Sequence, residues 1–379
     1  MTSPAYTWVD SNDQLATRLG KFLSSPQPLY SLDTEFASGY AYDPVLALVQ
    51  LGLGPDILLV DPFVVDLTLL APLFASPSLA ILHAAVQDLD LLARAVGTRP
   101  THLFDTQVAA SLLGYATPAL ATLVRRLGVT LSKAEQRADW TKRPLKEKTL
   151  TYAADDVRYL PELYSRLDAE LLKRARRDWL DSEMATLLAR PLSLRVPEQA
   201  WWRIPAALSA SLTHQHYYQN LCSARDTIAR GENCPPTHVL SDVNVTALVR
   251  SMPNSPANLS RHPALGELSE ELRVTLVNAL CAPVVNFAEP PRSPNPTEER
   301  LITVLSAYAT SLATRLNIDR SLLATKTDIT DLLLGRPTRL MVPWRRSVLT
   351  NDLTDLIAGT KSLLFSGTDI VTGPVAHAL

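Results

Sequence analysis

The sequence has few cysteines, no long apolar run and almost no net charge. The cysteines at positions 222, 234 and 281 are widely spaced and odd in number, which excludes a disulfide framework and a zinc pattern. They fit a reducing compartment. Every apolar run is short or interrupted by charge or proline, which excludes a membrane span. A net charge of −2 and a pI near 6.4 exclude a histone-like, uniformly basic nucleic-acid binder.

The N-terminus, MTSPAYTWVD, has neither the basic segment nor the apolar segment of a secretory signal. Together with the cysteine usage, this predicts a cytoplasmic protein. Hydrophobic residues make up 46% and charged residues 20% of the chain, which is typical of a soluble folded protein. A length of 379 residues suits two or three domains.

The first half of the chain alternates short apolar runs with helical patterns. Apolar runs bounded by turn residues predict strands at 28–36, 45–53, 56–61 and 79–84. Helical periodicity predicts helices at 66–74, 88–96, 105–114 and 118–128, and a long helical stretch from about residue 145. This order predicts an α/β domain over residues 1–190.

The second half reads as helical, and we expect no strand after residue 190. A helical domain is predicted at 199–283, a proline-rich linker at 284–297 and a second helical domain at 298–379. The final stretch, GTDIVTGPVAHAL, is expected to be poorly ordered.

The stretch SLDTEF (31–36) places two carboxylates, Asp33 and Glu35, on one face of a strand that is otherwise built for burial. Unpaired, they would repel each other and raise each other's pKa. A divalent cation between them removes the repulsion, and Mg²⁺ favours such oxygen ligands. Acid-x-acid triplets also arise by chance, so the pair alone is compatible with no site at all.

Two further motifs contain acids at helical positions. His83 ends a strand and Asp88 begins the next helix, where a carboxylate can equally cap free amides and complement the helix dipole. Tyr152 and Asp156 are neighbours on one face of a later helix, with Asp155 turned away. This phenol could orient a water beside a metal-binding acid, although an isolated pair is more typical of a half-buried tyrosine beside a solvated acid.

Taken in order, Asp-x-Glu, His-x₄-Asp and Tyr-x₃-Asp resemble the motifs of the DEDD exonuclease superfamily, in its DEDDy branch. The stretches LALVQLG (46–52), LFDTQVAA (103–110) and ADWTKRPLKEKTLTYAADDVRYL (138–160) resemble the ribonuclease D family in order and spacing. The resemblance covers residues 28–165. It implies an α/β ribonuclease H-like (DnaQ-like) exonuclease domain with a mixed sheet, followed by two all-α HRDC-like domains.

The resemblance also implies roles for single residues. Two divalent cations, Mg²⁺ or Mn²⁺, would be held by four carboxylates: Asp33, Glu35, Asp88 and Asp156. Tyr152 would orient the attacking water or help to deprotonate it. His83 and Asp105 fall on motif positions too, and we expect His83 to support a strand end and Asp105 to cap a helix.

Local charge fits a polyanionic ligand better than the net charge does. Residues 120–148 hold three acids and eight basic residues: Arg125, Arg126, Lys133, Arg137, Lys142, Arg143, Lys146 and Lys148. Phosphate contact is one use of such a segment, and a solvated loop and helix face is the other. Arg143 is the first candidate for substrate binding, with Lys142 and Lys146 beside it.

The first helical domain resembles HRDC modules loosely, and the second only in outline. Where a more basic helix is usual, the stretch CSARDTIARGENC has only Arg225 and Arg230, so RNA binding by this domain stays open.

The resemblance implies a monomeric 3′→5′ exoribonuclease that uses a two-metal mechanism and releases nucleoside 5′-monophosphates. Its RNA partners would be the 3′ ends of precursor tRNA and other small structured RNAs. A DEDDy exonuclease that acts on DNA is one alternative, and a non-catalytic RNA-binding protein on a nuclease fold is another. The presence of all four acids and the tyrosine argues against the non-catalytic alternative.

Overall fold

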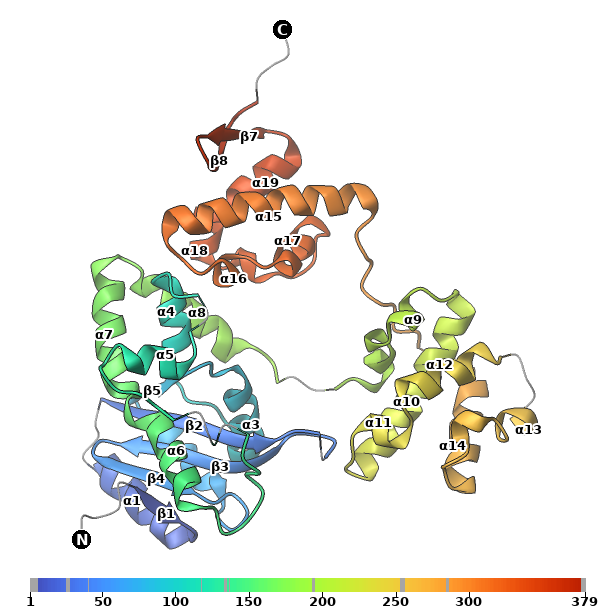
Figure 1. The fold of residues 1–379 in the computed structure, drawn as a ribbon, viewed down its shortest axis with the longest axis horizontal. Coiled ribbons are helices and arrows are strands. Elements are labelled where there is room, and N and C mark those ends of the chain that lie inside the picture. The colour runs from blue at the N-terminus through green and yellow to red at the C-terminus, as the bar shows by residue number, and fades with distance from the viewer. Residues whose placement is uncertain are drawn as a thin grey trace. The chain divides into compact units, whose positions relative to one another are not determined.

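The computed structural model describes residues 6–24, 28–39, 41–116, 118–132, 135, 137–192, 195–252, 256–283 and 286–375 (Figure 1). Two compact units make up the chain, and both are discontinuous in sequence. The first contains Met1–Glu35, Leu46–Leu192 and Pro294–Leu379, and the second contains Phe36–Val45 and Ser193–Ser293. Within the described residues, every helix is too short or too polar to cross a bilayer.

A six-stranded sheet forms the base of the first unit, in the order β1-β4-β3-β2-β5-β6. The strands are β1 (Thr7–Val9), β2 (Leu29–Ala37), β3 (Val45–Leu53), β4 (Asp56–Val60), β5 (Leu79–Leu82) and β6 (Leu103–Asp105). The pairs β1–β4, β2–β5 and β5–β6 are parallel, whereas β3 and β4 form an antiparallel hairpin. The predicted mixed sheet is therefore confirmed, and the three-residue strands β1 and β6 were not predicted.

Eight α-helices accompany this sheet among the described residues up to 192. They are α1 (Asn12–Ser24), α2 (Ala71–Phe74), α3 (Val86–Val96), α4 (Thr106–Leu112), α5 (Leu120–Arg125), α6 (Glu147–Arg158), α7 (Leu160–Lys173) and α8 (Arg177–Ala189). Helix α6 contacts β4 and crosses the sheet in Figure 1. Gly52 of β3 leaves room for the Ser31 side chain of the sheet strand β2, because a Cβ atom at position 52 would stand 2.1 Å from Ser31 Oγ.

The second unit is helical and has its own hydrophobic core. Its helices are α9 (Pro205–Leu208), α10 (Leu212–Gly231), α11 (Pro236–Val239), α12 (Asp242–Arg250), α13 (Pro256–Leu259) and α14 (Glu270–Cys281). Serines 211, 241 and 269 cap the three longest of these helices by accepting a backbone amide. Trp201 and Leu221 lie fully buried in the core. Segment 36–45 joins this unit, where Tyr42 bonds to the Asp226 carboxylate.

The C-terminal part of the first unit is mainly helical but not wholly so. Its helices are α15 (Pro296–Leu316), α16 (Arg320–Leu323), α17 (Lys326–Leu333), α18 (Pro343–Arg345) and α19 (Asn351–Ala358). They are followed by an antiparallel hairpin of β7 (Lys361–Ser366) and β8 (Asp369–Pro374). The expectations that no strand follows residue 190 and that the stretch from Gly367 is poorly ordered are wrong up to residue 375, since the backbone bonds of the hairpin order it. Residues 376–379 lie outside the described residues.

This C-terminal domain packs directly against α8 of the nuclease part. The rings of Trp179 and Trp344 stack with centroids 4.8 Å apart. Arg345, fully buried, donates from Nη2 to Glu183 Oε2 at 2.9 Å. Arg176 donates to the carbonyls at the C-terminal end of α15. One continuous hydrophobic core therefore joins the two domains.

Candidate active site

Strand β2 presents Asp33 and Glu35 on one face, as the period of two predicts. Thr34, between them, is buried and donates its hydroxyl hydrogen to Asp88 Oδ1 of helix α3. The strand and the helix are thereby bonded to each other at the residues that carry the acids. Sequence reasoning did not single out Thr34, because a threonine in a strand carries no signal of its own.

Asp88 is buried in the first turn of α3 but is not its cap, since Ala85 occupies the N-cap position without a side-chain bond. Asp105 fixes the turn before α3: its carboxylate accepts the amides of Ala84 at 3.1 Å and Ala85 at 2.8 Å. It also caps α4, accepting the Gln107 amide at 2.8 Å, so the predicted capping role is confirmed.

His83 lies at the end of β5, where its Nδ1 is 2.9 Å from the Thr106 hydroxyl, consistent with the supporting role expected for it. Burial lowers the pKa of His83, which favours the neutral ring. The motif histidine therefore links the end of β5 to the start of α4 as a neutral side chain.

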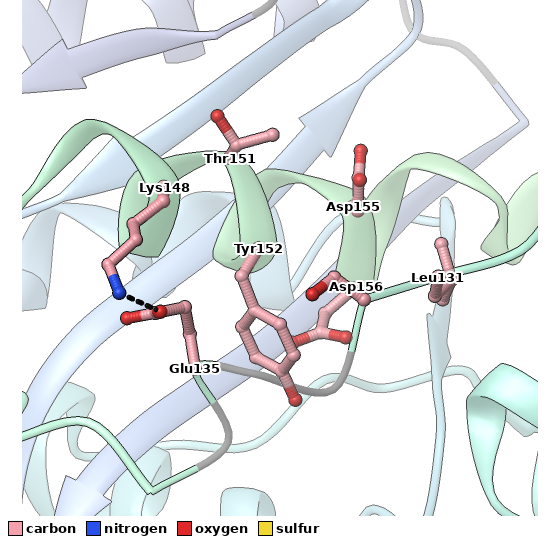
Figure 2. Close-up of a pocket in the computed structure, with 8 residues that line it drawn as sticks. Leu131, Glu135, Lys148, Thr151, Tyr152, Asp155 and Asp156 are labelled. Atoms are coloured by element: carbon pink, nitrogen blue, oxygen red, sulfur yellow. Dashed lines mark ion pairs between the residues drawn. The ribbon is translucent and has the colours of Figure 1, made fainter.

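Helix α6 brings Tyr152 and Asp156 to the same face (Figure 2). A hydrogen bond between the two side chains contributes to the pKa of each. Asp155 points away from them in Figure 2 and pairs with Arg158 at 2.9 Å. Burial and the nearby carboxylates raise the pKa of Tyr152 above its usual range. Its hydroxyl therefore keeps its proton and acts as a donor.

The acids from β2 and α6 converge on one point. Ligand oxygens of Asp33, Glu35 and Asp156 all lie within 4.8 Å of one another. Asp88 is not one of these three, but it accepts the hydroxyl of Thr34, which lies between the two β2 acids. Two of the three segments predicted to supply the carboxylates, β2 and α6, therefore bring ligand oxygens together, and the Thr34 bond ties the third, α3, to β2.

Burial and mutual repulsion make the charged forms of these acids unfavourable. Burial first, and then the charges of Asp88, Asp156 and Glu35, raise the pKa of Asp33 well above its usual range. Burial and the neighbouring acids raise the pKa of Glu35 to about 9. Burial raises the pKa of Asp156 to about 7 and that of Asp88 to about 6. Hard oxygen donors held this closely fit divalent cations, whose charge would offset the repulsion.

A cavity of about 390 Å³ opens beside Tyr152 and Asp156. Its lining comes from α6 and from the segment before it: Leu131, Ser132, Glu135, Lys148, Thr151, Tyr152, Asp155 and Asp156. Figure 2 shows Lys148 reaching across to Glu135, with their charged atoms 2.7 Å apart. Lys148 belongs to the basic stretch for which phosphate contact was one expected use, whereas Glu135 was not singled out.

Arg143 is placed differently from the phosphate contact that we expected. Its guanidinium makes two bonds to Asp61, at 2.7 and 2.8 Å, and another to the Ala47 carbonyl at 2.7 Å. With these donors turned inward, the structure gives no support to Arg143 as a substrate residue. Lys142 lies 3.5 Å from Asp139, and Lys146 is exposed at the N-cap of α6. Lys133 lies outside the described residues.

Comparison with known proteins identifies the two matching domains and the relatives of the whole chain. Residues 6–172 match a family model described as 3′-5′ exonuclease, and residues 214–269 match the HRDC domain. Ribonuclease D of Jannaschia sp. is 30% identical, with 95% of this chain and 97% of that protein covered. Ribonuclease D of Pseudomonas paraeruginosa is 34% identical over 69% of each chain.

Among solved structures, Escherichia coli RNase D, described as an exoribonuclease involved in structured RNA processing, superimposes with a TM-score of 0.82 at 26% identity. The match covers 93% of this chain and 99% of that one. The nuclease fold, its mixed sheet and the helical HRDC domain are therefore as the sequence predicted, and the protein is a nuclease that uses divalent metal. The chain belongs to the ribonuclease D family.

Proposed function

We propose that the protein is a 3′→5′ exoribonuclease whose carboxylates Asp33, Glu35, Asp88 and Asp156 hold two divalent cations, Mg²⁺ or Mn²⁺. The single observation that carries the proposal is the meeting of β2 and α6 oxygens within 4.8 Å, beside a protonated tyrosine. Cations bound there would activate a water for in-line attack on phosphorus and stabilise the leaving 3′ oxygen. Each cycle would release a nucleoside 5′-monophosphate.

The residues of this chain contribute positioning and charge. The four acids confine the cations to one point and, without them, would repel a polyanion. Tyr152, held by Asp156, would orient the attacking water through its hydroxyl. Thr34 fixes Asp88 against β2, so that acids from three separated segments keep a common position.

The RNA substrate class follows from the family, and we propose the 3′ ends of precursor tRNA and of other small structured RNAs. The exposed lysines of the 138–148 segment, Lys142 and Lys146, are proposed to contact phosphate. We also propose that the protein acts as a cytoplasmic monomer, with domains close to the boundaries 1–190, 199–283 and 298–379.

Labelled oligonucleotides test this function. Purified protein is offered matched RNA and DNA, each labelled at the 5′ end, with Mg²⁺, Mn²⁺ or EDTA. We expect a ladder of RNA shortened from the 3′ end with either metal and none in EDTA. Faster trimming of DNA would favour the DNA alternative, and binding without cleavage in every metal would favour the non-catalytic one.

A further inference from the structure

Lys148 lies on the same face of α6 as Tyr152 and Asp156, because the three are spaced at four-residue intervals. All three line the same cavity. At 1.5 Å per residue, Lys148 starts about 12 Å along the helix from Asp156. A lysine therefore stands toward one end of the cavity, and Asp156, the member of the carboxylate cluster that lines it, toward the other.

The ammonium group of Lys148 is held in place by a carboxylate that is itself fixed. Glu135 is only 8% exposed and accepts the hydroxyl of the buried Thr149 at 2.8 Å. Its other oxygen lies 2.7 Å from Lys148 Nζ. The bonds from Lys148 and Thr149 lower the pKa of Glu135, which keeps it charged. The Lys148 side chain is still 66% exposed, so its ammonium remains open to a ligand in the cavity.

Helix stability does not account for this lysine. A cation in the first turn opposes the helix dipole, which favours acids at that end. Lys146, the N-cap residue, makes no side-chain cap bond either. The basic character at this end of α6 is therefore a feature of the cavity and not a device that stabilises the helix.

We propose that Lys148 binds a phosphate of the RNA on the 5′ side of the cleaved linkage, and that Glu135 positions it. This rests on the proposed function. The nucleotide released from the 3′ end has no phosphate beyond the one that is cleaved, so a phosphate bound away from the carboxylates must belong to the retained strand. Lys148 would thus position the RNA strand so that its last phosphodiester linkage lies at the carboxylates.

Replacement of single phosphates by neutral methylphosphonates tests the contact. RNA oligonucleotides carry one such linkage at the first, second, third or fourth position on the 5′ side of the cleaved bond. We measure kcat/KM for the removal of the last nucleotide by the wild-type protein. At one position we expect a loss on the order of tenfold, the size of one charge-assisted hydrogen bond.

The same series is then measured with variants. In Lys148→Met, kcat/KM on unmodified RNA should fall about tenfold. The methylphosphonate at the sensitive position should then lower kcat/KM little further. Two variants should show the same loss of kcat/KM from that methylphosphonate as the wild-type protein. They are Lys148→Arg, which keeps the charge, and Lys173→Met, which removes an exposed lysine of α7. Glu135→Gln keeps an acceptor for Thr149. It should make the loss of kcat/KM from the methylphosphonate smaller, and the sensitive linkage should stay the same.

The proposal is overturned if each methylphosphonate lowers kcat/KM of Lys148→Met as much as it lowers that of the wild-type protein. It is also overturned if Lys148→Met and Lys173→Met have equal kcat/KM on unmodified RNA. Thermal unfolding checks that the variants are folded, and Lys148→Gln replaces the methionine variant if that one is not. Failure of the proposed function is separate, because the wild-type protein would then not trim unmodified RNA in Mg²⁺ or Mn²⁺.

Discussion

At the scale of single residues, the site combines a stabilising bond with a destabilising repulsion. Thr34 bonds to Asp88 and ties the strand to the helix. Asp33 and Glu35 are partly buried beside other acids, which makes their charged forms unfavourable. The proposed cations would offset this cost, so a variant that replaces one of the acids tests the trade between stability and activity.

Asp33→Asn should stabilise the protein in EDTA and abolish its nuclease activity. The amide cannot ionise, so it removes the cost of holding a carboxyl whose pKa is raised on folding; each pKa unit is worth about 1.4 kcal/mol, and the melting temperature should rise by a few degrees. Wild-type protein should gain melting temperature on addition of Mn²⁺, and the variant should gain much less. Thermal unfolding with EDTA or Mn²⁺ measures both effects. An undiminished Mn²⁺ response in the variant contradicts the assignment of Asp33 as a ligand.

Tyr152→Phe should lower kcat about 10- to 100-fold and change KM less than twofold, since the hydroxyl is assigned to the water and not to RNA binding. Tyr217→Phe, on α10 of the second unit, is the matched control and should leave both constants unchanged. Single-turnover and steady-state rates on one RNA separate the two constants. A large rise in KM at constant kcat would show that Tyr152 binds substrate instead.

At the scale of elements, one carboxylate joins two helices to the sheet edge. Asp105, 1% exposed, ends β6, caps α4 and accepts the two amides that precede α3. Ala84, in the turn it holds, has a positive φ of 59°. This backbone conformation is uncommon for residues other than glycine. It directs the chain so that the first turn of α3 places Asp88 in the site.

Asp105→Ala should therefore destabilise the first unit by about 2–3 kcal/mol, because one buried and three partly buried amides lose their acceptor. It should also reduce kcat, since the turn that presents Asp88 is no longer fixed. Asp90→Ala is the comparison variant and should keep kcat. Asp90 lies on α3 with Asp88 but pairs with Arg99 and Arg190. Urea unfolding and nuclease rates measure the pair. Equal kcat values for the two variants would count against the positioning role.

Arg143 and Asp61 should couple stability to pH. Burial alone would raise the pKa of Asp61, but the bonds from Arg143 and the Phe63 amide outweigh it and lower that pKa. Stability from Asp61 is then present above its unfolded pKa of about 3.9 and is lost as pH falls through the lower folded value. In Arg143→Met the carboxyl is buried without its cation, so its pKa should rise.

The cost of Arg143→Met should accordingly be about 2–4 kcal/mol at pH 7 and smaller at pH 4.5, where the unpaired Asp61 can bind a proton. Denaturant unfolding at the two pH values measures the difference. Asp61→Asn/Arg143→Met should show no such pH dependence. A cost that stays constant between pH 4.5 and 7 would contradict the ion pair as its source.

The elements also show what a sequence can and cannot predict. Strand and helix periods place Asp33 beside Glu35 and Tyr152 beside Asp156, because these positions depend only on local geometry. The partner of Arg143 is 82 residues away in sequence, and no local pattern indicates it. The same holds for Glu135 and Lys148, which meet through the path of a loop. The hairpin β7–β8 was missed because its apolar runs are only two or three residues long and its strands are at most half-buried.

At the scale of the whole molecule, contacts in space divide the chain differently from composition. The proline-rich linker suggested that the last domain is separate, but the stacked Trp179 and Trp344 and the buried Arg345–Glu183 pair place it in the same compact unit as the nuclease. The helices of the second unit enclose a separate core around Trp201. Each unit should therefore unfold as one cooperative body.

Calorimetry should then resolve two transitions that respond to different substitutions. Trp344→Ala removes a side chain that is 4% exposed and should cost the first unit about 3–5 kcal/mol, lowering one transition only. Leu248→Ala, in the core of the second unit, should cost about 2–5 kcal/mol and lower the other. Since Trp344 lies far along the sequence from every proposed metal ligand, a fall in the transition that Mn²⁺ raises would demonstrate that the C-terminal domain supports the nuclease fold. If Trp344→Ala instead lowered the transition that Leu248→Ala lowers, the two-unit organisation would be wrong.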